Sequence, residues 1–430
     1  MNTPEVAIIA GGKGSRINDL AQGKPKCLMP VNGTTILDLQ LDFFARNNIK
    51  KIHMFLGYGS DQVIRHLASR HDLEFVFYVE SRPKGTAGEL LSKLVGIDEN
   101  IIVVHGDLYL DFPIQEMLDE INDPRISFIQ LVHPSNHMGD SDIVETDETG
   151  NIIAIRIKPH HKDLVIRNQC NAGVFVFSKS WLRRISDVAS KFEGDKIDLD
   201  RELIPGLLAS GLKGRAHRNI GTVRDLGTPE RLSQFTPYFN VGDSSYLKPM
   251  IFLDRDGVIN QDSGWISRSE DFNIYADVPE AISILNQSGF RIVVVTNQPV
   301  VARGEISLTD LNYLHSILDM KLAEQDAFID EYFVCPHHPD SGFVGEIKEL
   351  KIACDCRKPD VGLLVQALKK FPTNIQNSWM IGDSWRDLEA ATRMKINFIQ
   401  VDRELKTTES LKQTPVFSNL LSAVNHLLKI

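Results

Sequence analysis

The sequence of 430 residues has few cysteines, no excess of positive charge and no long apolar run. Five cysteines cannot form a disulfide framework in a chain of this length, which excludes the disulfide-rich secreted class. A membrane-spanning helix needs roughly 20 consecutive apolar residues, and no run approaches that length. Acidic residues outnumber basic ones, 57 to 47, so a polyanion such as nucleic acid would be repelled on average. We therefore expect neither a membrane nor a nucleic acid as partner.

The start of the chain, MNTPEVAIIAGGKGSR, lacks the basic segment, apolar core and cleavage site of an export signal. We therefore expect a cytoplasmic protein with reduced thiols. The counts of 29 glycines and 19 prolines are ordinary, which excludes a low-complexity or collagenous chain. At roughly 100–200 residues per domain, the length predicts two or three domains.

Strand-like apolar runs alternate with helical patterns along most of the chain, as is typical of α/β domains. The pattern lapses near residues 236–248, which favours a linker there. We predict two Rossmann-like α/β domains at residues 1–238 and 248–430, with a linker at 239–247. The expected strands are 6–10, 52–56, 75–79, 101–105, 250–253, 292–296, 329–334 and 379–381, and the expected helices include 36–44, 279–288, 308–323 and one from about 385.

A glycine-rich turn, Gly11-Gly12-x-Gly14-x-Arg16, follows the first predicted strand. Such a turn lets backbone N–H groups approach phosphate oxygens, although it can also be merely a tight strand-to-helix connection. It matches neither the P-loop nor the G-x-G-x-x-G dinucleotide fingerprint. The next motif along the chain is Pro25-Lys26-x-Leu28-x-Pro30-Val31.

These two motifs together resemble the sugar-1-phosphate nucleotidyltransferases. The resemblance continues, in the family's order, through Gly85-Thr86-Ala87-Gly88, Gly106-Asp107, Asn171-Ala172-Gly173 and Asp225-x-Gly227-Thr228-Pro229. It implies a mixed sheet in the first domain. It also implies attack of a sugar-1-phosphate oxygen on a nucleoside triphosphate, with release of pyrophosphate. That reaction depends on charge neutralisation and alignment.

The same resemblance implies roles for individual residues. Arg16 and Lys26 would be catalytic, neutralising the departing pyrophosphate and the meeting phosphates, and Asp107 with Asp225 would hold Mg²⁺. Ile157 stands where the family usually has a glutamate that contacts a sugar hydroxyl. Nucleotide and phosphate binding falls to Gly11, Gly12, Gly14, Arg16, Gly85, Thr86, Ala87 and Gly88, and sugar-phosphate binding to Lys26, Lys158, Asn171 and Gly173.

A second motif, Asp254-x-Asp256-Gly257, ends the strand predicted at 250–253. Two acids two positions apart on an extended chain point the same way, so one can attack phosphorus while the other moves a proton. An acidic turn without function is the alternative. The motif is followed by Thr296-Asn297, Lys358 and Gly382-Asp383-x-x-x-Asp387, and this ordered set resembles the haloacid dehalogenase (HAD) phosphohydrolase superfamily.

This resemblance implies a parallel sheet and a phosphatase mechanism in the second domain. Asp254 would form an aspartyl-phosphate, and Asp256 would act as general acid and then base. Thr296 and Lys358 would hold the transferring phosphoryl oxygens. Mg²⁺ would be held by Asp254, Asp383 and the backbone carbonyl of Asp256, and Asp387 would lie near the ion without binding it directly.

The pattern Cys335-x-His337 with Cys354-x-Cys356 supplies three thiolates and an imidazole, a normal closed ligand set for a structural Zn²⁺. His338 lacks the motif spacing, so we assign the ligand role to His337. The alternative is three reduced cysteines in an ordinary loop. A zinc-bound loop over residues 335–356 would hold Arg357 and Lys358 in place.

The zinc pattern followed by Arg357-Lys358-Pro359 resembles the heptose-1,7-bisphosphate 7-phosphatase branch of the superfamily. That branch implies a phosphate contact for Arg357 and a pocket lined by Asn297 and Gln298. Pro299-Val300 departs from the usual Ser-Gly of the branch. Histidinol-phosphate phosphatases share the zinc pattern.

The presence of both domains in one chain favours one pairing of activities, because a 7-phosphatase yields heptose 1-phosphate, which a nucleotidyltransferase can consume. We expect a bifunctional enzyme of nucleotide-activated heptose synthesis, with GTP favoured because the GDP-heptose route uses this transferase fold. The alternatives are a mannose-like hexose 1-phosphate substrate with a histidinol-phosphate-like phosphatase, or a regulatory or assembly protein with one inactive half. The sequence leaves the base, the anomer and the oligomeric state open.

Overall fold

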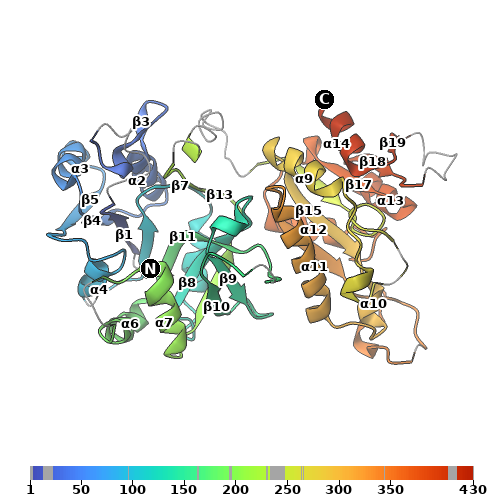
Figure 1. Cartoon of the computed structure of the whole chain (residues 1–430), viewed down its shortest axis with the longest axis horizontal. Coiled ribbons are helices and arrows are strands. Elements are labelled where there is room, and N and C mark those ends of the chain that lie inside the picture. The colour runs from blue at the N-terminus through green and yellow to red at the C-terminus, as the bar shows by residue number, and fades with distance from the viewer. Residues whose placement is uncertain are drawn as a thin grey trace. The chain divides into compact units, whose positions relative to one another are not determined.

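A computed structural model describes residues 3–12, 23–94, 96–161, 164–192, 196–228, 231–232, 247–262, 264, 266–342, 344–404 and 414–429. Predicted site residues Gly14 and Arg16, and all of the predicted linker except Leu247, lie outside the described residues. The chain divides into two compact α/β units (Figure 1). The first comprises Met1–His133, Asp142–Ile157 and Cys170–Ser245, and the second comprises Pro134–Ser141, Lys158–Gln169 and Tyr246–Ile430.

The first unit is built on a mixed sheet, which confirms the predicted fold class. In the described residues it has nine strands, in the order β10-β9-β11-β6-β1-β4-β5, with β8 beside β11 and β12 beside β8. Strands β1, β4, β5 and β6 run parallel, whereas β11 runs antiparallel to β6, β8 and β9. The strands are β1 (Glu5–Ala10), β4 (Lys51–Leu56), β5 (Glu74–Val79), β6 (Ile101–His105), β8 (Phe128–His133), β9 (Ile143–Thr146), β10 (Ile152–Arg156), β11 (Cys170–Phe177) and β12 (Gly214–Arg218).

Shorter elements complete the first unit. Its helices are α2 (Ile36–Arg46), α3 (Ser60–Leu67), α4 (Gly88–Leu94), α5 (Ile114–Glu120), α6 (Leu182–Ala189) and α7 (Ile204–Ala209). Two small pairs of strands join β2 (Pro30–Val31) to β3 (Thr34–Thr35) and β7 (Leu108–Asp111) to β13 (Thr222–Asp225). Helix α2 begins where the Thr35 hydroxyl accepts a hydrogen bond from the Asp38 N–H at 3.1 Å, a normal N-cap.

The second unit confirms the predicted parallel sheet. Its described strands follow the order β16-β15-β14-β17-β18-β19, and every neighbouring pair is parallel. The strands are β14 (Met250–Leu253), β15 (Arg291–Asn297), β16 (Glu331–Cys335), β17 (Trp379–Gly382), β18 (Asn397–Val401) and β19 (Val416–Phe417). The helices are α9 (Val278–Gln287), α10 (Pro299–Ala302), α11 (Leu308–Ala323), α12 (Gly362–Lys370), α13 (Trp385–Met394) and α14 (Leu420–Leu428).

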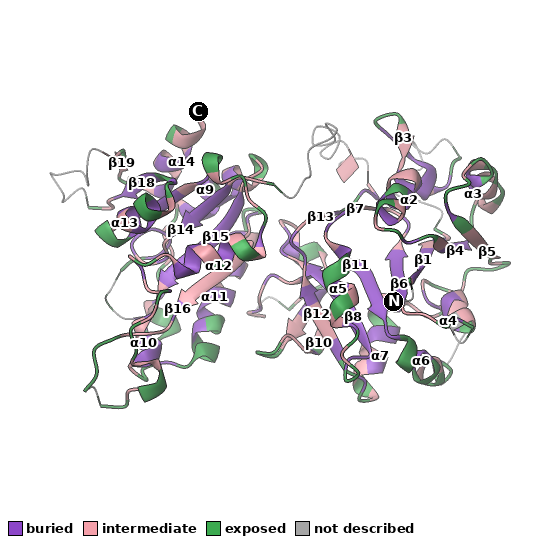
Figure 2. Ribbon diagram, turned by 180° about the vertical axis from the view of Figure 1, so that it is seen from behind, coloured by how far each residue is buried: buried purple, intermediate pink, exposed green. Residues whose placement is uncertain are grey.

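The strands at the centre of both sheets are the most buried elements (Figure 2). Strand β14 is buried along its whole length, as expected of a parallel strand in a sheet covered on both faces. Each fully buried Val, Leu or Ile side chain contributes about 1.5–3 kcal/mol of transfer free energy, so these apolar runs hold the sheets together. The motif residues can therefore lie in polar loops at the strand ends, because the apolar packing of the sheets does not depend on them.

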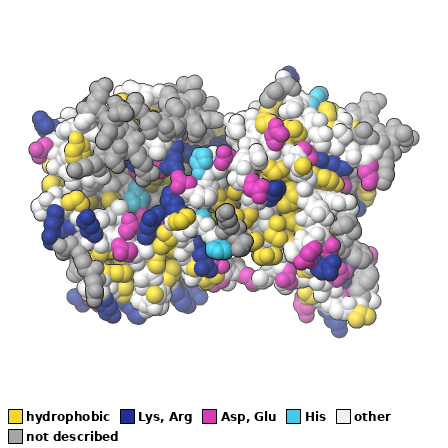
Figure 3. Space-filling view, in the orientation of Figure 1, with side chains coloured by type: hydrophobic (Ala, Val, Ile, Leu, Met, Phe, Trp, Pro, Cys, Tyr) yellow, Lys and Arg dark blue, Asp and Glu magenta, His cyan; other side chains and the backbone are white. Residues whose placement is uncertain are grey.

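The visible face of each unit carries both basic and acidic side chains (Figure 3). Across the described residues, every helix falls short of the length and apolarity that a membrane span requires.

Candidate active sites

The phosphatase motifs lie at the carboxyl ends of three neighbouring parallel strands. Asp254 follows β14, Thr296 lies near the end of β15, and Asp383 follows β17. Strand β14 pairs with both β15 and β17, so these three ends meet at one edge of the sheet. That edge is where open α/β sheets bind their ligands.

Three carboxylates gather at this edge. Oxygens of Asp254, Asp383 and Asp387 all lie within 4.8 Å of one another. One buried ammonium group faces them, since Lys358 Nζ lies 2.9 Å from Asp254 Oδ1 and 2.6 Å from Asp387 Oδ1. Asp387 is further occupied by the start of α13, where it accepts bonds from the Ser384 N–H and hydroxyl.

The electrostatics of this group suit a divalent cation. Burial, and then repulsion by Asp387, raise the pKa of Asp254 well above its ordinary range. The same two causes raise the pKa of Asp383 to about 7. One lysine is therefore too little positive charge for three carboxylates. Because all the donors are hard oxygens, the group fits Mg²⁺.

Lys358 is held in place by Asn297, the residue at the end of β15. The Asn297 amide donates to the Lys358 carbonyl at 3.0 Å, and the Lys358 N–H donates back to Asn297 Oδ1 at 2.9 Å. Lys358 itself is 2% exposed. The sequence analysis assigned Asn297 to the pocket lining, and the structure shows that its amide also connects two motifs.

The carboxylate of Asp256 lies among three side-chain donors, from Arg255, Asn260 and Gln298. Arg255 and Asn260 were missed by the sequence analysis. A signal for them was present, since Arg255 lies inside the Asp254-x-Asp256-Gly257 motif and Asn260 follows it by three residues.

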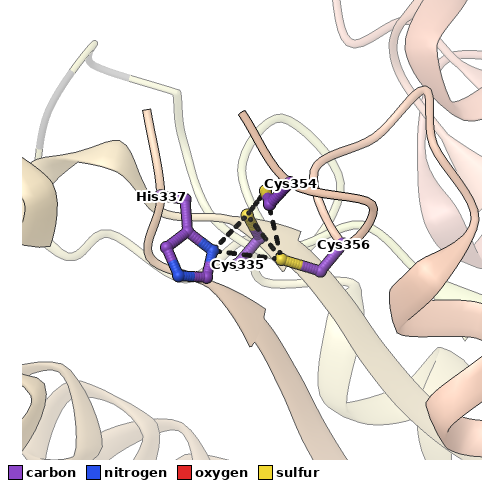
Figure 4. A group of neighbouring side chains, drawn as sticks. All are labelled: Cys335, His337, Cys354 and Cys356. Carbon is purple, nitrogen blue, oxygen red and sulfur yellow. Dashed lines mark hydrogen bonds between the residues drawn. The ribbon is translucent and has the colours of Figure 1, made fainter. Parts of the chain in front are cut away.

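The four predicted zinc ligands come together at the end of β16 (Figure 4). The three Sγ–Sγ distances are 3.6 Å for Cys335–Cys354, 3.2 Å for Cys335–Cys356 and 3.3 Å for Cys354–Cys356. His337 Nδ1 lies 3.2 Å from Cys356 Sγ. Four ligands about 2.3 Å from one zinc would be separated by about 3.8 Å, so these spacings approach those of a tetrahedral site.

The thiols of this cluster lack a compensating charge of their own. Burial raises the pKa of Cys335 to about 11, and burial with the neighbouring thiols raises the pKa of Cys356 further. Thiolates here therefore need a cation, and the donor set fits Zn²⁺. His338 is not part of the cluster, and its Nδ1 accepts a bond from the Asp340 N–H.

In the first unit, Gly11 and Gly12 follow β1, and three charged motif residues meet nearby. Lys26 Nζ contacts the Asp107 carboxylate, and Leu226 N–H donates to the Asp107 carbonyl at 2.9 Å. Asp225 is in register with Leu108 in the β7–β13 pair. A Cβ at Gly227 would collide with the Lys26 ammonium group, which explains the glycine of the D-x-G-T motif. Asp107 directly precedes β7 and Asp225 ends β13, so the backbone pairing brings these two residues near each other, and both remain candidates for Mg²⁺ binding.

Each carboxylate of this pair has a cationic partner. Burial alone would raise the pKa of Asp107, but Lys26 and His105 outweigh it and hold that pKa below its ordinary range. Asp225 is paired with Arg231. The carboxylate oxygens fit Mg²⁺, a hard cation.

The predicted sugar-binding loop packs on a residue that the sequence analysis missed. Asp200, in the short π-helix η5 (Leu199–Leu203), accepts from Asn171 Nδ2 at 2.5 Å and from His105 Nε2 at 3.0 Å. Asp200 raises the pKa of His105 to about 9, against the effect of burial. Gly173 has φ +71°, and a Cβ there would lie 2.8 Å from the His105 ring. The D-x-D pattern at 198–200 was the available signal.

The predicted nucleotide-binding stretch, residues 85–88, forms hydrogen bonds with the start of η5 and the residues just before it. Thr86 Oγ1 accepts from the Leu199 N–H at 2.7 Å, and the Ala87 N–H donates to the Ile197 carbonyl at 2.9 Å. Gly85 has φ +80°, which favours glycine, and Gly88 begins α4. Lys158 lies in a segment grouped with the second unit, where its ammonium donates to Asp140 Oδ1 at 2.8 Å.

Comparison with known proteins relates the two parts of the chain to two families. The model of the nucleotidyl transferase family matches residues 6–239, more than half of the chain, and a HAD-hydrolase-like model matches residues 355–423. The D-glycero-beta-D-manno-heptose-1,7-bisphosphate 7-phosphatase of Escherichia coli K12 is 38% identical over 148 residues, which are 34% of this chain and 75% of that protein.

Two solved structures are also similar. HddC from Yersinia pseudotuberculosis, complexed with GMP-PN, is 19% identical, with a TM-score of 0.46 over 55% of this chain and 100% of its own. The D,D-heptose 1,7-bisphosphate phosphatase from B. bronchiseptica, complexed with magnesium and phosphate, is 30% identical, with a TM-score of 0.37 over 42% of this chain and 98% of its own. By its family match and its phosphatase relatives, the chain belongs to the nucleotidyl transferase family and carries a C-terminal HAD-like phosphatase domain of the heptose-1,7-bisphosphate 7-phosphatase family.

Proposed function

We propose that this bifunctional enzyme removes the 7-phosphate of D-glycero-D-manno-heptose 1,7-bisphosphate and then joins the resulting heptose 1-phosphate to a nucleotide. The observation that carries the proposal is the pairing, in one chain, of a nucleotidyl transferase with a domain related to heptose bisphosphate phosphatases. The product of one reaction is then the substrate of the other. The first step uses a sugar bisphosphate and the second a sugar phosphate with a nucleoside triphosphate, and we place both steps in the cytoplasm.

In the phosphatase reaction, an Asp254 oxygen attacks phosphorus while the bond from phosphorus to the sugar oxygen breaks. Asp256 gives its proton to that oxygen. A water then gives a proton to Asp256 and attacks the aspartyl-phosphate, which releases phosphate and restores Asp254. Thr296 and Lys358 hold the phosphoryl oxygens in both steps. Mg²⁺, held by Asp254, Asp383 and the Asp256 carbonyl, would supply charge neutralisation.

The zinc cluster has a positioning role in this proposal. Zn²⁺ would close the loop from Cys335 to Cys356, and Arg357 and Lys358 follow that loop directly. Arg357 donates to the His337 carbonyl at 3.4 Å, which is consistent with a guanidinium held against the cluster. We assign Arg357 to a substrate phosphate and Asn297 with Gln298 to the pocket wall.

In the transferase reaction, a phosphate oxygen of heptose 1-phosphate attacks the α-phosphorus of the triphosphate, and pyrophosphate leaves. The backbone of Gly11, Gly12 and Gly14 would bind phosphate, and Arg16 with Lys26 would neutralise the charge that develops. Asp107 and Asp225 would hold Mg²⁺. The nucleotide would lie against Gly85, Thr86, Ala87 and Gly88, and the sugar phosphate against Lys26, Asn171 and Gly173.

We assign GTP as the nucleotide, because the GDP-heptose route uses this transferase fold. The test is to incubate the protein and Mg²⁺ with heptose 1,7-bisphosphate and each nucleoside triphosphate in turn. We expect phosphate with every mixture, and pyrophosphate with NDP-heptose only with GTP. Product formation with another nucleotide would refute the base assignment. Absence of phosphate release from the heptose bisphosphate, with release from histidinol phosphate, would refute the pathway.

A further inference from the structure

The Asp256 carboxylate is held by three buried donors. Arg255 donates to Asp256 Oδ1 through Nε at 3.1 Å and through Nη2 at 2.9 Å, and Nη2 also reaches Oδ2 at 3.2 Å. The Asn260 amide donates to Oδ1 at 2.9 Å, and the Gln298 amide donates to Oδ2 at 2.6 Å. Arg255, Asn260 and Gln298 are only 1%, 0% and 3% exposed. Both carboxylate oxygens are therefore fixed from the protein side.

Gln298 differs from the other two donors because it comes from a different strand end. Its Nε2 also donates to Thr296 Oγ1 at 2.8 Å, so its two N–H groups are used on Asp256 and Thr296. Its backbone N–H donates to the Cys335 carbonyl at 2.8 Å. One side chain thus joins the carboxylate after β14 to the hydroxyl on β15. No N–H of this amide is left for a substrate.

We propose that Gln298 is a positioning residue that aims Asp256 at the oxygen of the leaving alcohol. Without the 2.6 Å bond from Gln298, Oδ2 keeps only the longer 3.2 Å contact from Arg255 Nη2, which Nη2 shares with Oδ1. The carboxylate can then rotate about its last single bond while Arg255 and Asn260 still hold Oδ1. The protonated oxygen of Asp256 would then no longer point at the oxygen of the leaving alcohol. This inference rests on the proposed acid role of Asp256.

A positioning role and a purely structural role predict different results with different leaving groups. A sugar alkoxide is strongly basic and needs a proton as it leaves, whereas p-nitrophenolate leaves without one. Loss of a well-placed acid therefore slows alkyl phosphates much more than aryl phosphates. General distortion of the site slows both.

The test compares Gln298→Met with the unaltered full chain, in Mg²⁺, on heptose 1,7-bisphosphate and on p-nitrophenyl phosphate. Methionine matches glutamine in length but donates no hydrogen bond. We expect kcat on the sugar phosphate to fall about 10- to 100-fold with little change in KM, and kcat on p-nitrophenyl phosphate to change little. Equal losses on both substrates, or a change confined to KM, would overturn the proposal. Gln287→Met on α9, where the exposed amide bonds to Ser283, is the matched control and should leave both rates unchanged.

Two further variants separate the possible failures. Gln298→Asn keeps an amide but is one methylene too short to reach both partners, so it should show the same selective loss if Gln298→Met does not fold. Failure of both variants to fold would overturn the proposal in favour of a folding role.

Asp256→Asn should show a selective loss of activity on the sugar phosphate that is at least as large as that of Gln298→Met. If Asp256→Asn slows both substrates equally, the acid role itself is wrong. If only the Gln298 variants lack selectivity, the positioning role alone is wrong.

Discussion

In the second unit, Asp254, Asp383 and Asp387 surround a single buried lysine, whereas in the first unit Asp107 and Asp225 each face a cation of their own. The pKa directions follow this difference, raised for Asp254 and lowered for Asp107. The phosphatase carboxylates thus require added positive charge even without substrate. The carboxylates of the first unit are already balanced, so under the proposed reaction they would need a metal only when the charge of the triphosphate arrives.

The largest effect expected from this comparison is that of Asp254→Asn. The change removes the proposed nucleophile, so phosphate release should fall on the order of 1000-fold or more. Pyrophosphate release from supplied heptose 1-phosphate and GTP should stay near normal. Parallel assays of phosphate and pyrophosphate on the same preparation check this. A folded variant that loses both activities equally would show that the two sites are not independent.

Asp107→Ala should give the mirror result. Nucleotidyl transfer should fall about 100-fold or more, because the variant loses a proposed Mg²⁺ ligand and the partner of Lys26. Phosphate release from the heptose bisphosphate should be unchanged. Normal transfer at ordinary Mg²⁺ would mean that the Gly106-Asp107 assignment is incorrect.

Cys356→Ser tests the zinc cluster. Metal analysis of the unaltered protein should find about one zinc per chain, and the variant should lose it. Phosphatase activity should then fall about 100-fold, because a shift of about 1 Å in Arg357 or Lys358 misplaces the phosphate. Nucleotidyl transfer should not change, since none of the four ligands lies in the first unit. Absence of zinc from the unaltered protein would leave three reduced cysteines as the interpretation.

Direct titration with Mg²⁺, in the absence of nucleotide and sugar, sharpens the electrostatic comparison. Binding to the ligand-free chain should be weakened about 10- to 100-fold by Asp383→Asn, which removes one carboxylate from the unbalanced group. Asp107→Ala should leave this binding unchanged. Equal weakening by the two changes would contradict the idea that only the second site is unbalanced before substrate arrives.

The smallest expected effect comes from His315 on α11. This buried imidazole lies beside Arg255 and Arg167, and burial followed by those charges lowers its pKa well below 6.5. Below pH 6.5 the unfolded chain therefore takes up a proton that the folded chain does not. The free energy of unfolding of the second unit should fall by about 1.4 kcal/mol per pH unit from this group alone, and its contribution is retained above pH 6.5. Urea unfolding of the unaltered chain and of His315→Phe at pH 7 and pH 5.5 checks this. Identical pH dependence in both would contradict it.

Local sequence patterns were enough to predict the strands and helices that carry the motifs. The strand expected at 250–253 is β14 at the same bounds, and the strand expected at 379–381 is β17, one residue longer. The helix expected at 308–323 is α11, which begins at the Ser307–Asp310 capping box. These agree because apolar runs, helical periodicity and caps are local signals. The family resemblance implied only a mixed sheet. Strands β8, β9 and β11 and their antiparallel pairing were not predicted, since pairing between distant segments has no local signal.

By itself, the sequence determined the two α/β domains, the motif residues at their strand ends and the spacing of the Cys/His set, because each depends on residues close together in the chain. Only the tertiary structure decided that Lys358 lies between Asp254 and Asp387, that Asp200 joins Asn171 to His105, and that Gln298 joins Asp256 to Thr296. Such contacts, and the charge balance they create, depend on distance and burial in the folded chain. Residue spacing does not contain that information.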